Sequence, residues 1–105
     1  MPRPKRFRRI GFSPEITFFK QQEVTMSHLE QVDICLDKLE AIRLNDYEEI
    51  NMEEGAKKMK ISRSTFQRLV ASAHKKIADS LINGKAIMIH RQIDFNFPSE
   101  GDFLR

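Results

Sequence analysis

The clearest pattern along the chain is an apolar residue at every third or fourth position of its second half. This stripe consists of Phe66, Leu69, Val70, Ala73, Ile77 and Leu81. Such spacing places the stripe on one face of an α-helix. Ser62 precedes the stripe and can cap the first helical turn, and Asn83-Gly84 follows it with residues that tolerate the left-handed backbone of helix ends. We therefore predict a long helix from Arg63 to about Ile82.

A shorter apolar stripe predicts an earlier helix. It consists of Leu36, Leu39, Ile42 and Tyr47. Asp37, followed by Glu40 three residues later, matches the capping box, in which two side chains bond reciprocally to free backbone amides. We expect this helix to begin near Asp37 and to end near Asp46. A further short helix is expected over His28 to Ile34.

The stretch from Asn51 to Lys76 matches a helix-turn-helix, in which two short helices cross steeply and are joined by a tight turn. Asn51 and Glu54 repeat the capping box and predict a first helix from Met52 to about Met59. The motif requires a small residue at the crossing, apolar residues on both sides of the turn, and an apolar pair inside the second helix. These positions are filled by Ala56, Met59, Ile61, Phe66 and Leu69.

Two residues depart from this motif. Lys60 occupies the turn position where glycine is common, and a lysine adopts a left-handed conformation there only at some cost. Gly55 lies inside the first helix, where alanine would be more favourable by about 1 kcal/mol. Both residues are expected to lower stability without excluding the motif.

β-Branched and aromatic residues predict two short strands outside the helices, Ile16–Phe19 and Ala86–Ile89. Ile93, Phe95 and Phe97 alternate with polar residues and can extend the second strand. The two strands can pair within one chain, or across two chains to build a homodimer. The expected fold is therefore a mainly α helix-turn-helix bundle with short flanking strands. Its parts are a basic arm (residues 1–14), the bundle with its strands (15–89) and a C-terminal extension (90–105).

Charged residues divide the chain into blocks of opposite sign, although the net charge is only +3. The first ten residues carry five cations and no acid. Residues 30–54 carry nine acids and two bases, whereas residues 57–76 carry seven bases and no acid. A basic face of this kind favours a polyanion such as double-stranded DNA.

The candidate DNA contacts lie on the face of the long helix opposite its apolar stripe. The first residues of a recognition helix face base edges in the major groove, where arginine can grip guanine and glutamine can grip adenine. The candidates for base contact are Arg63, Ser64, Gln67 and Arg68. The candidates for phosphate contact are Ser62, Thr65, Lys57, Lys58, Lys75 and Lys76. The alternative for the same residues is a solvated helix face without a ligand.

The N-terminal arm is a second candidate for DNA contact. Its cations are Arg3, Lys5, Arg6, Arg8 and Arg9. Such an arm can enter a minor groove or follow phosphates. Two alternatives stay open: a disordered solubilising tail, and docking on the acidic stretch from Asp46 to Glu54 of the same or a partner chain.

The remaining polar residues give no sign of catalysis. His28, His74 and His90 lack the spacing of metal ligands. Cys35 is the only cysteine, so a disulfide framework is excluded, and we expect it to be buried. No apolar run is long enough to span a membrane, and the basic N-terminus does not continue as a signal peptide. We expect a cytoplasmic protein without a catalytic residue, metal or cofactor.

Several stretches resemble known families. Leu36 to Leu44 and Ile61 to Phe66 are similar to the region-four helix-turn-helix of sigma-70-type factors. The chain as far as Ile89 more closely resembles the UPF 0251 (DUF 134) family of small, uncharacterised prokaryotic proteins that are predicted to bind DNA. The stretches that carry this second resemblance are Met1-Pro2-Arg3-Pro4, Arg8-Arg9, Tyr47-Glu48, Glu53-Glu54, Ser62-Arg63 and Asn83-Gly84-Lys85-Ala86.

The family resemblance implies a cytoplasmic DNA-binding protein. The chain departs from the family's usual residues at Phe7, Lys60 and Ser64, where cysteine, glycine and proline are common. From the residues and the resemblance together, we expect sequence-specific binding of double-stranded DNA by a homodimeric transcriptional regulator. The alternative is a protein-interaction module whose helices bind RNA polymerase or another regulatory protein.

Overall fold

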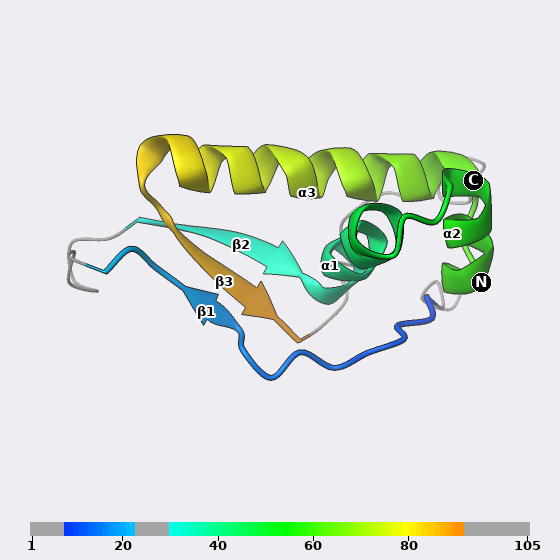
Figure 1. Cartoon of the computed structure of the whole chain (residues 1–105), viewed down its shortest axis with the longest axis horizontal. Helices are drawn as coiled ribbons and strands as arrows, with labels where there is room; N and C mark the ends of the chain where they lie inside the picture. Colours follow the sequence, from blue (N-terminus) through cyan, green and yellow to red (C-terminus); the bar gives the residue numbers. More distant parts are fainter. Residues whose placement is uncertain (1–7, 23–29, 92–105) are drawn as a thin grey trace, which may run out of the picture.

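A long helix runs along one side of the molecule, beside a small sheet and two shorter helices (Figure 1). The computed structural model describes residues 8–22 and 30–91. Its elements are β1 (Phe18–Phe19), β2 (Gln31–Cys35), α1 (Leu36–Ile42), the π-helical η2 (Arg43–Tyr47), α2 (Met52–Met59), α3 (Arg63–Asn83) and β3 (Ala86–His90). Across these residues, we find no helix with both the length and the apolar character that a membrane span requires.

The sheet has the strand order β1-β3-β2, so the last strand of the sequence lies in the middle (Figure 1). β1 runs antiparallel to β3, with Phe18 opposite Met88, which confirms that the two predicted strands pair, and they pair within one chain. β2 runs parallel to β3, with Ile34 opposite Ile89. Parallel neighbours need a long crossover connection, and here that connection contains all the helices.

The helix predicted over His28 to Ile34 is wrong, because its described part belongs to strand β2. Val32 and Ile34 are buried there, whereas Gln31 and Asp33 are exposed. This alternation has the two-residue period of a strand with one buried face. β2 packs against α3, so its buried side chains join the sheet to the long helix.

α1 begins directly after β2, with Cys35 as its N-cap and no side-chain bond at the cap. The predicted capping residue, Asp37, instead lies in the first turn and is fully buried. The capping prediction failed because the chain enters this helix straight from a strand, so the helix begins earlier. The helical stretch ends at Tyr47, one residue past the predicted end near Asp46, and its last residues are π-helical.

Local side-chain bonds cap α2 and α3 as predicted. The side chain of Asn51 accepts a hydrogen bond from the amide of Glu54 at 2.8 Å. Oγ of Ser62 accepts one from the amide of Thr65 at 3.2 Å. Each bond satisfies one of the amide groups that a helix leaves free in its first turn. The two caps therefore set where α2 and α3 begin.

Left-handed backbone ends both helices. Lys60, with a φ of 61°, is the C-cap of α2, which confirms the conformation expected at this turn. Gly84, with a φ of 70°, ends α3 just after Asn83, one residue past the predicted end. Glycine adopts this conformation without strain, whereas a lysine does not.

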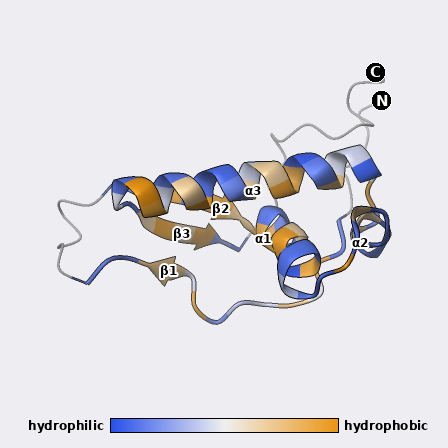
Figure 2. Cartoon of the chain, turned by 45° about the horizontal axis from the view of Figure 1, so that its top comes forward, coloured by the Kyte–Doolittle hydropathy of each residue, from blue (hydrophilic) through white to orange (hydrophobic). Residues whose placement is uncertain are grey.

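The main core lies where α1, α2 and α3 meet. Its buried hydrophobic residues are Ala41, Leu44, Ala56, Met59, Phe66, Leu69 and Val70. A Cβ added at Gly55 would lie 2.5 Å from Cζ of Phe66, far closer than carbon atoms approach. The expectation that this glycine only lowers stability is therefore wrong, because it makes room for the phenyl ring. Figure 2 shows hydrophobic residues along β2 and β3 and an alternation of both kinds along α3.

Candidate functional site

The first turns of α3 present polar side chains to solvent on the side away from the core. The four residues predicted to contact bases are all exposed; they are Arg63, Ser64, Gln67 and Arg68. On the opposite side of the same turns, Phe66 and Leu69 are 0% exposed. The core packing of the helix thus holds these four side chains outward on a rigid element.

The start of α3 departs from the prediction at one position. Thr65, predicted to contact a phosphate, is only 1% exposed. Its hydroxyl accepts a hydrogen bond from Oγ of Ser62 at 2.9 Å, so the threonine completes the cap from inside. Ser62 is half-buried, and its Oγ lies 3.3 Å from Oγ of Ser64. Thr65 therefore has a structural role, whereas Ser62 and Ser64 remain near the surface.

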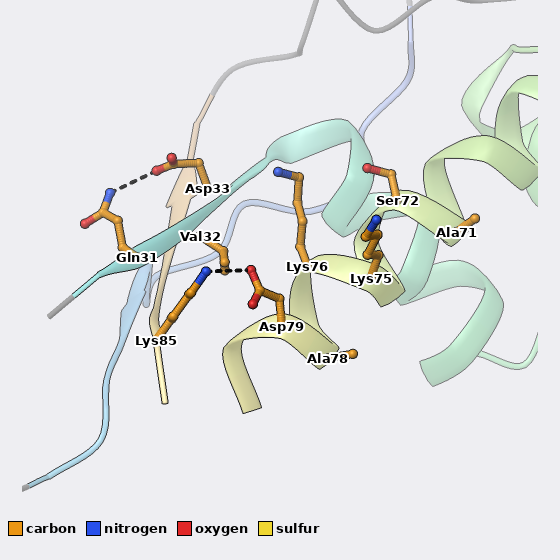
Figure 3. Close-up of a pocket in the computed structure, with 10 residues that line it drawn as sticks. All are labelled: Gln31, Val32, Asp33, Ala71, Ser72, Lys75, Lys76, Ala78, Asp79 and Lys85. Atoms are coloured by element: carbon orange, nitrogen blue, oxygen red, sulfur yellow. Dashed lines mark hydrogen bonds and ion pairs between the residues drawn. The ribbon is translucent and has the colours of Figure 1, made fainter. Parts of the chain in front are cut away.

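A groove of about 980 Å³ runs between α3 and the outer strand β2 (Figure 3). Ala71, Lys75 and Lys76 line it from α3, and Lys85 and Gln31 line it from the other side. Within residues 8–22 and 30–91, neither Lys75 nor Lys76 forms an ion pair. The groove therefore continues the exposed face of α3 with two cations, and it is also lined by the carboxylates of Asp33 and Asp79.

Lys85 and Gln31 were missed by the sequence reasoning. Gln31 lies in the segment predicted as a helix, and Lys85 lies beyond the predicted motif, so no local signal joined them to α3. The ammonium of Lys85 donates a hydrogen bond to Asp79 at 3.0 Å, and this bond raises the pKa of Lys85. The pKa of Asp79 is lowered, first by the amide of Asn83 and then by Lys85. Lys85 is thus already neutralised by its neighbour.

The described part of the basic arm packs on the bundle. Nε of Arg8 lies 3.6 Å from Oδ2 of Asp37, and both side chains are 0% exposed. The prediction that Arg8 contacts DNA is therefore wrong, because a buried carboxylate distant in sequence holds it inside. The other arm cations fall into two groups: Arg9 is exposed, and Arg3, Lys5 and Arg6 lie outside the described residues.

Lys57 and Lys58, the other predicted phosphate contacts, are exposed on α2. They do not line the groove beside β2; they line a separate hollow that also includes Arg9 and Arg43. The backbone amide of Arg9 donates to the carbonyl oxygen of Met59 at 3.0 Å, which holds the N-terminal segment beside the end of α2. The structure thus separates the predicted phosphate contacts into two surfaces.

Acidic and aromatic side chains flank the other side of α3. Nε2 of His74 lies 2.6 Å from Oδ2 of Asp46, which joins α3 to η2. Burial alone would raise the pKa of Asp46, but hydrogen bonds with His74 and Asn45 lower it overall. Tyr47, next along η2, is 82% exposed. This part of the molecule therefore offers an exposed phenol next to carboxylates in the sequence.

A second histidine–aspartate pair lies on the sheet. Nε2 of His90 on β3 lies 2.8 Å from Oδ1 of Asp33 on β2. This hydrogen bond, followed by one from Gln31, lowers the pKa of Asp33. Cys35 at the end of the same strand is only partly buried, whereas the sequence predicted burial. It lies at the junction of β2 and α1, where the sheet meets the helices.

The amino-acid sequence matches one protein family and several of its members. Residues 1–95 match the family model described as "Protein of unknown function DUF134". A UPF0251 protein of Caldanaerobacter subterraneus subsp. tengcongensis is 48% identical over 89 residues, which cover 85% of this chain and 75% of the relative. UPF0251 proteins of Pelotomaculum thermopropionicum and Moorella thermoacetica are 49% and 47% identical over the same share of this chain, with 67% and 60% of their own lengths covered. No solved structure shows a significant match.

Proposed function

The chain belongs to the DUF134 family, and we propose that it binds double-stranded DNA sequence-specifically through α2 and α3, acting in the cytoplasm as a transcriptional regulator. The observation that carries this proposal is the two-sided character of α3. Arg63, Gln67 and Arg68 are exposed, while Phe66 and Leu69 are 0% exposed on the reverse side. A helix anchored so firmly by one side can present the other to a groove.

The connection between the two helices supports a helix-turn-helix. α2 ends at Met59 with the left-handed Lys60 as its C-cap, and α3 begins at Arg63, directly after its N-cap Ser62. Gly55 of α2 contacts the ring of Phe66 so closely that no side chain fits between them. A tight turn and a close helix crossing are the two geometric requirements of the motif.

The motif assigns different roles to different parts of α3. Its first turns enter the major groove, where Arg63 and Arg68 can donate to guanine and Gln67 can pair with adenine. Ser64 lies beside them and can donate to either kind of base. Ser62 lies just before α3, and Lys75 and Lys76 lie farther along the helix than the base-contacting residues. These three residues can therefore bind phosphates on either side of the major groove and fix the register of the helix on the DNA.

A homodimer completes this proposal, because two copies can read two half-sites of a symmetric operator. Leu81 and Ile82 at the end of α3 are 76% and 79% exposed, and Phe19 on β1 is 50% exposed. These side chains offer apolar surface to a second copy. Sedimentation that shows a monomer at high concentration would remove the dimer and leave the DNA-binding surface intact.

The function is tested by selecting bound sites from a library of random duplex DNA. Recovery of one consensus sequence, in particular a palindrome, supports specific recognition by a dimer. Recovery of unenriched DNA, with affinity that depends only on salt, would reject sequence-specific binding.

A second candidate function is a protein-interaction module that contacts RNA polymerase or another regulatory protein. The exposed Tyr47 beside Asp46 and Glu48 favours it, because aromatic residues are enriched at protein interfaces. Binding of purified polymerase that Tyr47→Ala abolishes, together with no salt-dependent DNA binding, would favour this candidate over the first.

A further inference from the structure

A second hollow, of about 530 Å³, lies on the molecule beside the turn between α2 and α3. The N-terminal segment, the α1–η2 stretch and the end of α2 enclose it. Its charged lining consists of five cations and one carboxylate: Arg9, Arg43, Lys57, Lys58, Lys60 and Glu40. So strong an excess of one charge in a concave site raises the local concentration of anions.

The single carboxylate of this hollow is already engaged. Oε1 and Oε2 of Glu40 accept hydrogen bonds from Nε and Nη2 of Arg43 at 2.7 and 3.0 Å. Oε2 also accepts the amide of Gly11 at 2.9 Å. The other four cations form no ion pair within the described ranges. They therefore give the lining of the hollow an excess of positive charge.

The C-terminus of α2 does not account for this cluster. Cations near a helix end are stabilised by its carbonyl groups, which explains Lys57 and Lys58 in the last turn. It does not explain Arg9, which comes from a distant part of the sequence. The amides of Arg9 and Ile61 already bind the carbonyl oxygens of Met59 and Ala56 at 3.0 Å each. The helix end is thus satisfied by backbone, and the cationic side chains are left for another partner.

Backbone contacts hold the walls of the hollow in place. Arg9 is fixed at its amide, and Lys60 is fixed in the left-handed conformation of the C-cap. A Cβ at Gly11 would lie 2.8 Å from Nη2 of Arg43 and 3.2 Å from Oε2 of Glu40, so this segment runs close against the Arg43–Glu40 pair. The backbone of the site is therefore fixed before a ligand binds, and the entropy cost of binding falls on the exposed cationic side chains.

We propose that this hollow binds a small molecule that carries two or more adjacent phosphate groups. Lysine ammonium groups bind phosphates as point charges, and several cations from different directions suit a polyanion better than a single charge. The volume lies within the range of small-molecule sites. This assignment gives Lys57 and Lys58 a ligand other than DNA, and it does not depend on DNA binding by α3.

The test is isothermal titration of the full-length chain with inorganic pyrophosphate at physiological salt. We expect saturable one-to-one binding and a rise in Tm, because a ligand of the folded state stabilises it. The double variant Lys57→Gln/Lys60→Asn should lose about tenfold in affinity. Asparagine tolerates the left-handed conformation, so this variant keeps the turn intact. Circular dichroism checks that it folds.

The matched control is Lys75→Gln/Lys76→Gln, which removes the same charge from α3. Its pyrophosphate affinity should stay within roughly twofold of the original. Absence of saturable binding, or an equal loss in both double variants, would overturn the proposal. A random DNA duplex forms the second arm. If Lys57→Gln/Lys60→Asn weakens binding of the duplex as much as the control variant does, the hollow contacts the DNA backbone instead of a small phosphate compound. If the original protein does not bind DNA at all, the titration with pyrophosphate still tests the hollow independently.

Discussion

Nε of Arg8 lies 3.6 Å from Oδ2 of Asp37, with both side chains fully shielded from solvent. Arg8→Met should lower the free energy of unfolding by about 3–5 kcal/mol, because it removes the cationic member of a buried ion pair. Urea unfolding measures this change. The control is Arg9→Met, because the side chain of Arg9 is exposed and its replacement leaves the buried pair intact. Equal stability of the two variants would show that the buried pair does not hold the N-terminal segment on the bundle.

Gly55 offers a second test of packing. Gly55→Ala improves helix propensity by about 1 kcal/mol, yet the added methyl group would lie 2.5 Å from Cζ of Phe66. We expect a net loss of stability of about 1–3 kcal/mol from overpacking. In the background of Phe66→Leu, the same alanine should cost less or stabilise. A stabilised Gly55→Ala single variant would contradict the close crossing of α2 and α3.

Arg68 tests the base-contacting face. With a DNA site obtained by selection, Arg68→Ala should weaken specific binding by about 1–3 kcal/mol and relax the base preference at one position. Fluorescence anisotropy against the selected site and its single-base variants measures both effects. Unchanged affinity and preference would mean that this side of α3 does not read bases.

Lys75 tests the phosphate-contacting role with a different signature. Lys75→Ala should weaken binding to every duplex sequence alike and reduce the slope of affinity against salt by about one. Titrations at several salt concentrations, with specific and random DNA, measure that slope. A loss confined to the specific site would assign Lys75 to base reading instead.

Asp33 gives stability a small dependence on pH. Hydrogen bonds from His90 and then Gln31 hold its pKa below the ordinary value of 3.8. Its contribution is therefore present above the unfolded-state pKa and is lost as the pH falls through the lower folded-state pKa. Asp33→Asn should be less stable by under about 1 kcal/mol at pH 7, because the pair is largely exposed. The difference in Tm should shrink as the pH falls below 3.8; a difference that stays constant with pH would contradict the pairing.

The parts of the fold that were predictable depend on neighbours in sequence. The caps at Asn51 and Ser62 use residues three positions away, so the beginnings of α2 and α3 followed from local spacing. β2 was mistaken for a helix because its alternation is short, and its partner strand β3 lies at the far end of the helices. The burial of Arg8 and the role of Lys85 depend on contacts between distant segments, which no local pattern indicates.

The candidate site shows the same division. From Phe66 to Ala73, the apolar stripe of α3 predicted which side of the helix meets solvent, because helical periodicity fixes opposite faces. Leu81, the last member of the stripe, is instead 76% exposed. The stripe did not distinguish Thr65 from Ser62, because the helix entry turns one hydroxyl inward and leaves the other near the surface. It also did not separate Lys57 and Lys58 from Lys75, because that separation depends on how α2 lies against α1 and the N-terminal segment.

The parallel pairing of β2 with β3 has a consequence for the order of folding. Because every helix lies between these two strands in the sequence, their hydrogen bonds close a long loop that contains all the helices. Long-range closure carries an entropy cost that short-range helix pairing does not. The α2–α3 pair is therefore expected to form first, and the sheet to join last. A mutation in β3 should then mainly speed unfolding, whereas one at the α2–α3 crossing should slow folding.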